Sequence, residues 1–145
     1  MGLAERFHRK TLFLDTAPLI YFIEGQSPFH ESLHGIFKAN KDGQLHFITS
    51  SLTLLEVLVL PLRLKKNLLA DKYERLITKS QNIVVVDLDT SISRRAAGLR
   101  AKYNLKTPDA VQVATAIEKG ADFLLTNDAD FARVSEIDVL LLNDL

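Results

Sequence analysis

The sequence predicts an α/β fold of three layers, in which helices cover both faces of a central, mainly parallel sheet. Short apolar runs, each long enough for one buried strand, alternate along the chain with stretches of helical periodicity. Capping or turn residues follow most of these runs, as is typical where a strand leads into a helix. Such strand–helix–strand units pack with right-handed crossovers into a parallel sheet.

The predicted elements follow one another from residue 11 to the end of the chain. The expected strands cover residues 11–14, 46–48, 83–86, 123–125 and 138–142. The expected helices cover residues 19–23, 29–37, 53–61, 68–80, 89–103 and 107–120. Thr107 is expected to cap the last of these helices, with Pro108 at its first position, where the missing N–H of proline costs nothing.

The composition is that of a globular protein. We expect a single domain over residues 1–145, with an ordered core from about residue 11 to 142. Hydrophobic residues make up 47% of the chain, enough for a sizeable core. No apolar run has the length of a membrane span, and the charged first residues lack the apolar stretch of a signal peptide. The absence of cysteine excludes disulfides and thiolate metal sites, and it fits a cytoplasmic protein.

The charge balance gives no general sign of nucleic-acid binding. Lys and Arg together number 18, as do Asp and Glu, so any basic surface has to be local. The best candidates lead up to Asp109 and are Arg94, Arg95, Arg100, Lys102 and Lys106. Each of them can equally be ordinary solvated charge.

Four acidic residues stand where predicted strands end or predicted helices begin. They are Asp15, Glu56, Asp109 and Asp128. Parallel strands end at a common edge of a sheet, where ligands bind, so we expect the four carboxyl groups to meet there. Carboxylates drawn together in this way repel one another. A hard divalent cation, Mg²⁺ or Mn²⁺, relieves the repulsion, and no cysteine site or paired-histidine motif suggests zinc.

Each acid also has a structural explanation when it is taken alone. Asp15 can cap a helix, and Asp109 can stabilise the dipole of the helix that it opens. Glu56 can form a capping box with Thr53. Asp128 can belong to a solvated turn. A metal site is favoured because all four acids are expected at the same edge of the sheet.

Four short motifs resemble the PIN-domain family, and within it the single-domain toxins of the VapC type. They are F-L-D-T at 13–16, T-L-L-E-V at 53–57, T-P-D-A at 107–110 and T-N-D-A-D-F at 126–131. Each motif is weak alone, but their order and spacing are specific, and the resemblance covers residues 11–142. The usual Asp-Thr-Asn opening of the family is Asp15-Thr16-Ala17 here, so one accessory polar group is missing.

The resemblance implies a three-layer PIN-like fold and a catalytic metal site. In the family, acids at the positions of Asp15, Glu56, Asp109 and Asp128 bind Mg²⁺ or Mn²⁺. The resemblance further implies that these acids are supported by Thr16, Thr126 and Asp130. It leaves open whether Glu56 binds the metal or positions a water molecule.

The resemblance also implies an activity and partners. Family members cleave single-stranded regions of RNA, so RNA is the expected substrate. Water activated by the metal would attack the phosphate in line, leaving a 3′-hydroxyl and a 5′-phosphate. Toxin members pair with a small antitoxin protein that fills the acidic pocket, and many form homodimers. The expected protein is thus the toxin of a toxin–antitoxin pair.

Several alternatives stay open. A phosphatase of the haloacid-dehalogenase type needs a second Asp where Ala17 stands, and a receiver domain needs paired acids near the start of the chain. Within the PIN-domain family, a nuclease of RNA processing and a catalytically silent scaffold are the alternatives to a toxin. A silent scaffold usually lacks at least one of the four acids, and all four are present here.

The stretch from Leu54 to Leu64 carries more apolar residues than one helix face buries. We expect this helix to be buried on more than one side, or to form a partner or dimer surface together with the helix over residues 68–77.

Overall fold

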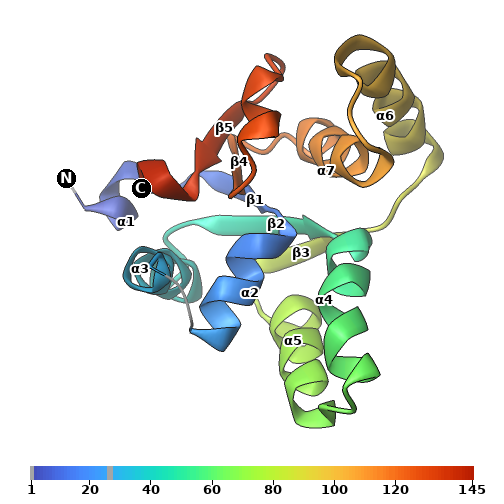
Figure 1. Ribbon diagram of the computed structural model, residues 1–145. Coiled ribbons are helices and arrows are strands. Elements are labelled where there is room, and N and C mark those ends of the chain that lie inside the picture. Colours follow the sequence, from blue (N-terminus) through green and yellow to red (C-terminus); the bar gives the residue numbers. More distant parts are fainter. Residues whose placement is uncertain (1, 26–27) are drawn as a thin grey trace.

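The computed structural model describes residues 2–25 and 28–145. Its centre is a sheet of the strands β1 (Thr11–Leu14), β2 (His46–Ser50), β3 (Ile83–Val86), β4 (Phe123–Thr126) and β5 (Asp138–Leu141). Their order in the sheet is β3-β2-β1-β4-β5, and each neighbouring pair is parallel (Figure 1). The predicted parallel sheet is confirmed.

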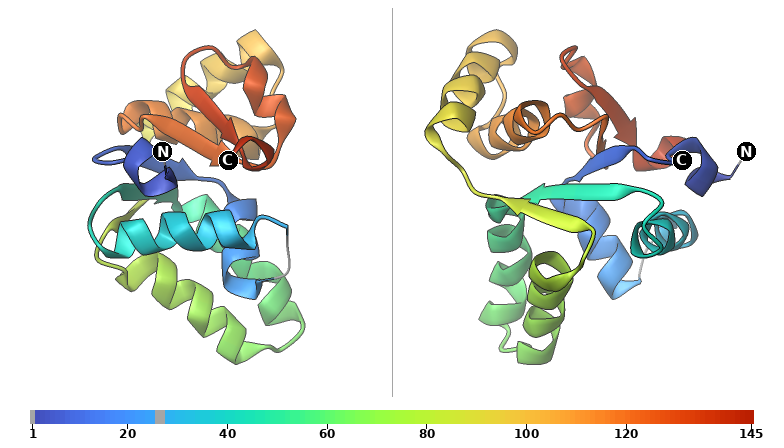
Figure 2. Two further views of the ribbon diagram at one scale, coloured as in Figure 1. Left: turned by 90° about the vertical axis from the view of Figure 1, so that its left-hand side faces the viewer. Right: turned by 180° about the vertical axis from the view of Figure 1, so that it is seen from behind.

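The described residues form seven α-helices and two short 3₁₀ helices. They are α1 (Leu3–Arg6), α2 (Thr16–Glu24), α3 (His30–Lys41), α4 (Ser51–Arg63), α5 (Asn67–Lys79), α6 (Thr90–Tyr103), α7 (Thr107–Glu118), η1 (Ala129–Arg133) and η2 (Leu142–Asp144). Helices α2 to α5 cover one face of the sheet, and α6 and α7 cover the other (Figure 1, Figure 2). The three layers are therefore confirmed.

Alternation along β1 divides the core into two halves. Leu12 and Leu14 are buried in a cluster with residues of α2 to α5. Phe13, which points to the opposite face, is buried in a second cluster with residues of α6 and α7. Since successive side chains of a strand point to opposite faces, one apolar strand supplies both halves. Burial on both faces fixes β1 in the middle of the sheet.

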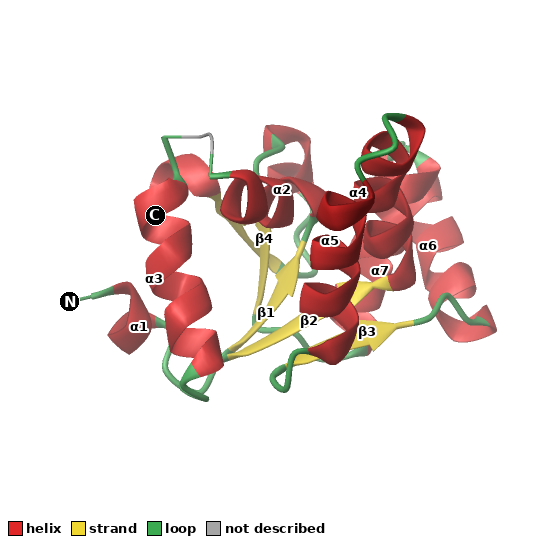
Figure 3. Cartoon of the chain, turned by 90° about the horizontal axis from the view of Figure 1, so that it is seen from below, coloured by secondary structure: helices red, strands yellow, loops and turns green. Residues whose placement is uncertain are grey.

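The chain reverses its direction of winding between β1 and β4. It runs outward from β1 through β2 to β3, then returns through α6 and α7 to β4 and β5 on the other side. β1 and β4 lie side by side (Figure 3), and such a reversal leaves a crevice at the carboxyl ends of the strands. Asp15 follows β1 directly and Asp128 comes soon after β4. The topology therefore brings these two acids to the same place.

Helix α4 begins earlier and ends later than the sequence predicts. Its cap is Ser50, whose hydroxyl accepts a hydrogen bond of 3.2 Å from the backbone N–H of Thr53. Thr53 therefore lies inside the helix, and the predicted capping box of Thr53 with Glu56 is wrong. Serine is a preferred cap where an extended residue precedes a helix, so Ser50 at the end of β2 takes that role. The helix continues past Pro61 to Arg63.

Helix α2 begins away from its predicted position, and helix α7 lacks its predicted cap. α2 begins at Thr16, directly after Asp15 and earlier than predicted. α7 begins at Thr107 itself, with Lys106 before it and no side-chain cap, so the predicted capping by Thr107 is wrong. Asp109 then lies in the first turn of α7, where a negative charge interacts favourably with the helix dipole.

The buried residues of helix α4 are Thr53, Val57 and Pro61, which lie one turn apart on one face, whereas its apolar sequence predicts burial on more than one side. The exposed apolar residues of α4 and of the turn into α5 form a patch, here called the α4 surface: Leu55, Val59, Leu60, Leu62, Leu64 and Leu68. The second expectation, a partner or dimer surface, stays a prediction. In the described part of the chain, no helix has both the length and the apolar character needed to cross a membrane.

Candidate metal centre

Asp15 is held at both of its carboxyl oxygens by neutral donors. The hydroxyl of Thr126 donates to Oδ2 at 2.7 Å, and the side-chain amide of Gln112 donates to Oδ1 at 3.4 Å. The backbone N–H of Asp15 donates to the carbonyl of Leu125 at 3.0 Å, which ties β1 to β4 just before the crevice. Neutral donors orient a carboxylate without adding a positive charge beside it, so a cation is the partner that would balance its charge.

Thr126 connects Asp15 to the turn that follows β4. Its hydroxyl oxygen accepts a hydrogen bond from the backbone N–H of Asp128 at 3.1 Å. Asp128 in turn caps η1, because its Oδ1 accepts from the backbone N–H of Asp130 at 2.9 Å. Thr126 thus touches two of the acids that it was predicted to support. Both acids after β4 are exposed, and the capping explains part of why an acid stands at 128.

Glu56 reaches the crevice from the second turn of α4. The hydroxyl of Thr16 donates to its Oε1 at 3.2 Å, a contact between α2 and α4. Burial raises the pKa of Glu56 above its ordinary value, the hydrogen bond from Thr16 lowers it, and the charges of Asp15 and Asp109 raise it further. A carboxylate in α4 therefore lies close enough to two other acids to be affected by their charge.

Asp109, in the first turn of α7, also lies near other acids. Burial raises its pKa first, and the charges of Asp128, Asp15 and Asp130 raise it further, whereas Lys106 lowers it. The pKa shifts of Glu56 and Asp109 together involve all four predicted metal-binding residues. These acids therefore lie near enough to one another for their charges to interact, and a shared metal site stays a prediction.

The donor set fits a hard divalent cation by its chemistry. All four groups are carboxylates, and neighbouring negative charges raise the pKa of Glu56 and of Asp109, an arrangement that a cation would stabilise. Within residues 2–25 and 28–145, no three His, Cys, Asp or Glu side chains are arranged so that they could hold a metal ion. Oxygens of Asp15, Glu56 and Asp128 accept hydrogen bonds from the protein instead.

Gln112, at the centre of the site, was missed by the sequence analysis. It lies one turn after Asp109 in α7 and is 1% exposed. Its Nε2 donates to the hydroxyl of Thr53 at 2.6 Å and to Asp15, and its Oε1 accepts from the hydroxyl of Ser50 at 2.5 Å. The sequence held a sign of this, since a glutamine among Ala110, Val111, Val113 and Ala114 breaks an otherwise apolar stretch.

The five predicted RNA-binding cations differ in their surroundings. Arg95 and Lys102 form ion pairs within the molecule, with N···O distances of 2.6 and 3.6 Å. Arg100 donates to a backbone carbonyl at 2.9 Å, and Arg94 is exposed on α6. Lys106 differs from these, since its charge lowers the pKa of the acid at the start of α7. Their contact with RNA stays a prediction, for which Lys106 has the best position.

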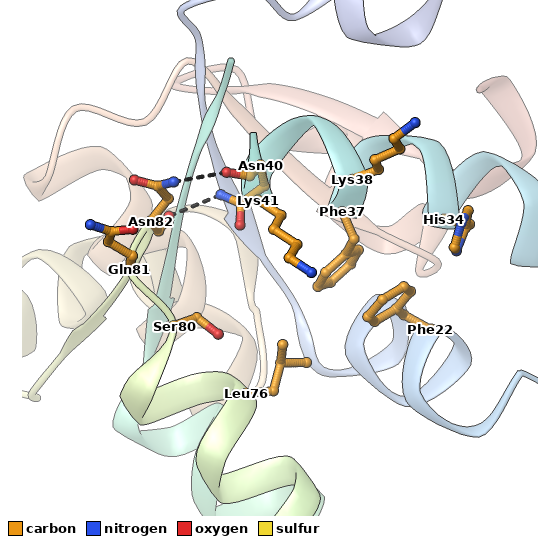
Figure 4. Close-up of a pocket in the computed structure, with 10 residues that line it drawn as sticks. All are labelled: Phe22, His34, Phe37, Lys38, Asn40, Lys41, Leu76, Ser80, Gln81 and Asn82. Atoms are coloured by element: carbon orange, nitrogen blue, oxygen red, sulfur yellow. Dashed lines mark hydrogen bonds between the residues drawn. The ribbon is translucent and has the colours of Figure 1, made fainter. Parts of the chain in front are cut away.

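A separate cavity of about 630 Å³ lies between α2, α3 and α5, at the amino edge of the sheet (Figure 4). Its apolar part contains Phe22 and Phe37, whose rings stack with centres 3.8 Å apart. The side-chain amides of Asn40 and Asn82 each donate to the other's backbone carbonyl at 2.9 Å and fix the end of α3 beside β3. Other lining residues are His34, Lys38, Lys41, Leu76, Ser80 and Gln81. The acids lie at the opposite, carboxyl edge of the sheet.

The family model of the PIN domain matches residues 12–137, a range that contains all four acids. The chain belongs to the PIN-domain family. A search of curated proteins gave no match. Among solved structures, this PIN-domain chain is similar to VapBC2 from Rickettsia felis bound to a promoter DNA fragment, with a TM-score of 0.73 and 17% identity over 90% of this chain and 98% of that one.

Two further structures share the fold. VapC20 from Mycobacterium tuberculosis, described as a toxin that cleaves the sarcin–ricin loop, matches with a TM-score of 0.69 and 18% identity over 88% of this chain and 98% of that one. A toxin–antitoxin complex from Klebsiella pneumoniae matches with a TM-score of 0.67 and 24% identity over 92% of this chain and 99% of that one. At these identities the likeness shows the fold.

Proposed function

We propose that this PIN-domain protein is a metal-dependent endoribonuclease, the toxin of a toxin–antitoxin pair, and that it cleaves single-stranded regions of RNA. The observation that carries the proposal is the convergence of Asp15, Glu56, Asp109 and Asp128 at the crevice between β1 and β4. A structural neighbour described as a toxin that cleaves an RNA loop supports the substrate class. Two other neighbours are toxin–antitoxin assemblies, which supports the toxin assignment.

In the proposed mechanism the four acids would hold Mg²⁺ or Mn²⁺, which supplies an activated water and an anchor for the phosphate. Asp15 stays in a fixed orientation because Thr126 and Gln112 donate to its two oxygens. Glu56 keeps its carboxyl group near the crevice through Thr16, where it can orient a water or accept its proton. Lys106 offers a positive charge for the phosphate of the substrate.

The test is a cleavage assay on a single-stranded RNA labelled at its 5′ end, with Mg²⁺, with Mn²⁺ and with a chelator. We expect cleavage only with metal, giving a 3′-hydroxyl and a 5′-phosphate, and no hydrolysis of a phosphomonoester. A protein that binds RNA but leaves it intact with both metals would indicate a silent scaffold. Growth arrest on expression, relieved by a small protein from a neighbouring gene, would separate a toxin from a nuclease of RNA processing.

We further propose that a small antitoxin protein fills the acidic site and that another part of it occupies the cavity between α2, α3 and α5 at the opposite edge of the sheet. Its apolar part, with Phe22, Phe37 and Leu76, suits a large apolar side chain of the partner. Lys38 and Lys41 on the rim are exposed and favour acidic residues beside that side chain. Reversing both lysines to Glu should weaken co-purification of the partner, whereas Lys72→Glu, an exposed lysine of α5 outside the cavity, should not.

The α4 surface is the proposed place of homodimerisation. Apolar side chains that remain exposed over one helix and the following turn are typical of a surface that is covered in an assembly. Sedimentation of the purified protein tests this directly.

A further inference from the structure

We infer that Gln112 is a positioning residue for the metal site, fixing the orientation of Asp15 from inside the core. The inference rests on the proposed function, since it assigns a role toward the cation that Asp15 would bind. Gln112 does not touch the substrate in this role. It acts through the carboxylate of Asp15, to which its amide donates at 3.4 Å.

The hydrogen bonds around Gln112 determine which end of its amide faces Asp15. The hydroxyl oxygen of Ser50 accepts the backbone N–H of Thr53, so its single proton is free for another acceptor. That proton goes to Oε1 of Gln112 at 2.5 Å. The amide therefore presents its two N–H groups to the other side, where one meets the hydroxyl of Thr53 at 2.6 Å and the other faces Asp15. A reversed amide would place an oxygen against a carboxylate.

Gln112 thereby joins parts of the site that belong to different elements. On one side it contacts the start of α4, the helix that carries Glu56. On the other side it holds one oxygen of Asp15, while Thr126 holds the second and also binds the backbone of Asp128. Asp109 lies on the same helix, one turn away. A single buried amide is thus hydrogen-bonded to Asp15 and to the two residues, Ser50 and Thr53, at the start of the helix that carries Glu56.

A buried glutamine at this position would lower stability if its amide had no hydrogen-bond partners. An amide taken out of water without partners is unfavourable, and the surrounding residues of α7 are apolar. Thr115 on the same helix shows how a buried polar group is satisfied without a link to the site. Its hydroxyl donates to the carbonyl of Val111 in its own helix at 2.7 Å. Gln112 instead directs its hydrogen bonds to three other segments.

The test compares Gln112→Met with Thr115→Val, a matched control on the same helix. Groups that orient metal ligands typically change metal affinity 10- to 100-fold when they are removed. Calorimetric titration with Mn²⁺ should show at least about tenfold weaker binding for Gln112→Met and affinity within twofold of wild type for Thr115→Val. In RNA cleavage at a fixed Mn²⁺ concentration, Gln112→Met should lower kcat while KM for RNA stays within about twofold, since RNA contacts are untouched.

Two outcomes would overturn the inference. If Gln112→Met folds and binds Mn²⁺ within twofold of wild type, Gln112 has only a structural role. If it does not fold, Gln112→Asn replaces it, because this variant keeps a neutral amide but shortens the side chain that reaches Asp15, and binding as tight as wild type then refutes the inference. A wild-type protein that binds no Mn²⁺ refutes the proposed function as well, whereas normal wild-type binding with an unaffected variant refutes the role of Gln112 alone.

Discussion

The substitution Asp109→Asn separates a metal ligand from a residue that merely stabilises a helix dipole. Asn has the same size, and it removes one negative charge and one strong metal ligand. Asp109 lies in the first turn of α7, so the loss of the dipole interaction should cost about 0.3–1 kcal/mol of unfolding free energy. If the dipole were its whole role, RNA cleavage would be unchanged.

The other charges around Asp109 affect stability in the opposite direction from the helix dipole. Burial and the charges of Asp128, Asp15 and Asp130 raise its pKa in the folded state. A raised folded-state pKa means that stability present below the unfolded pKa is lost as the pH rises through the folded pKa. Above the unfolded-state pKa the raised pKa of Asp109 therefore lowers the stability of the folded protein, and replacing Asp109 by Asn removes that cost. The metal-free variant should be as stable as wild type or more stable.

The assay measures thermal melting with chelator and with Mn²⁺, and RNA cleavage, for wild type and variant. We expect the metal-induced rise in Tm to shrink and cleavage to fall at least about 100-fold, beyond the 10- to 100-fold typical of residues that only support a ligand. Asp89→Asn is the control, because Asp89 caps α6 by accepting the N–H of Ile92 at 2.8 Å. An Asp109→Asn variant that cleaves RNA at nearly the wild-type rate would refute the site assignment.

Three further predictions follow from the same site and surface. Millimolar Mn²⁺ or Mg²⁺ should raise the Tm of wild type, because a metal at 100 times its Kd adds about 2.7 kcal/mol to the unfolding free energy. An unchanged Tm at millimolar Mn²⁺ would contradict a shared carboxylate site. Because the folded-state pKa values of Glu56 and Asp109 are raised, these groups should make the metal-free protein more stable as the pH falls from neutral through their folded-state pKa values, and urea unfolding should show this contribution shrinking in Asp109→Asn. Leu60→Glu on the α4 surface should turn a sedimenting dimer into a monomer with little change in Tm, whereas a wild-type protein that sediments as a monomer at high concentration would contradict the dimer.

The layers and strand positions could be predicted because each apolar run supplies a strand that is buried on both faces. Leu12, Phe13 and Leu14 fill both halves of the core, which only a central strand between two helix layers allows. The convergence of the acids followed from the same reasoning, since a rule about where parallel strands end needs no side-chain detail. The order of the strands, with the reversal between β1 and β4, then placed Asp15 beside the turn that holds Asp128.

Helix starts were predicted less well because neighbouring residues compete for the same cap. Thr53 was expected to cap α4, but Ser50 already stands at the end of β2 in an extended conformation and accepts the N–H of Thr53. The register of strand and helix, fixed by pairing with β1 and β3, decides between them. Likewise the exposure of Leu60 and Leu62 could not be predicted from the apolar sequence of α4. The same sequence pattern is found in internal helices and in helices whose apolar face binds a partner.

The interior of the site was the hardest part to predict, because it depends on how far individual side chains reach. Spacing along α7 placed Asp109 near the carboxyl edge, but the same spacing cannot say whether the residue one turn later faces the core or the site. In the fold, that residue reaches across to β2, α4 and Asp15 at once. Charge therefore determines where the acids gather, and neutral hydrogen bonds from Gln112, Thr126 and Thr16 determine how three helices and a strand hold them there. A site built in this way depends on residues that carry no charge. Substitutions of buried neutral residues should therefore change its metal affinity, as substitutions of the acids do.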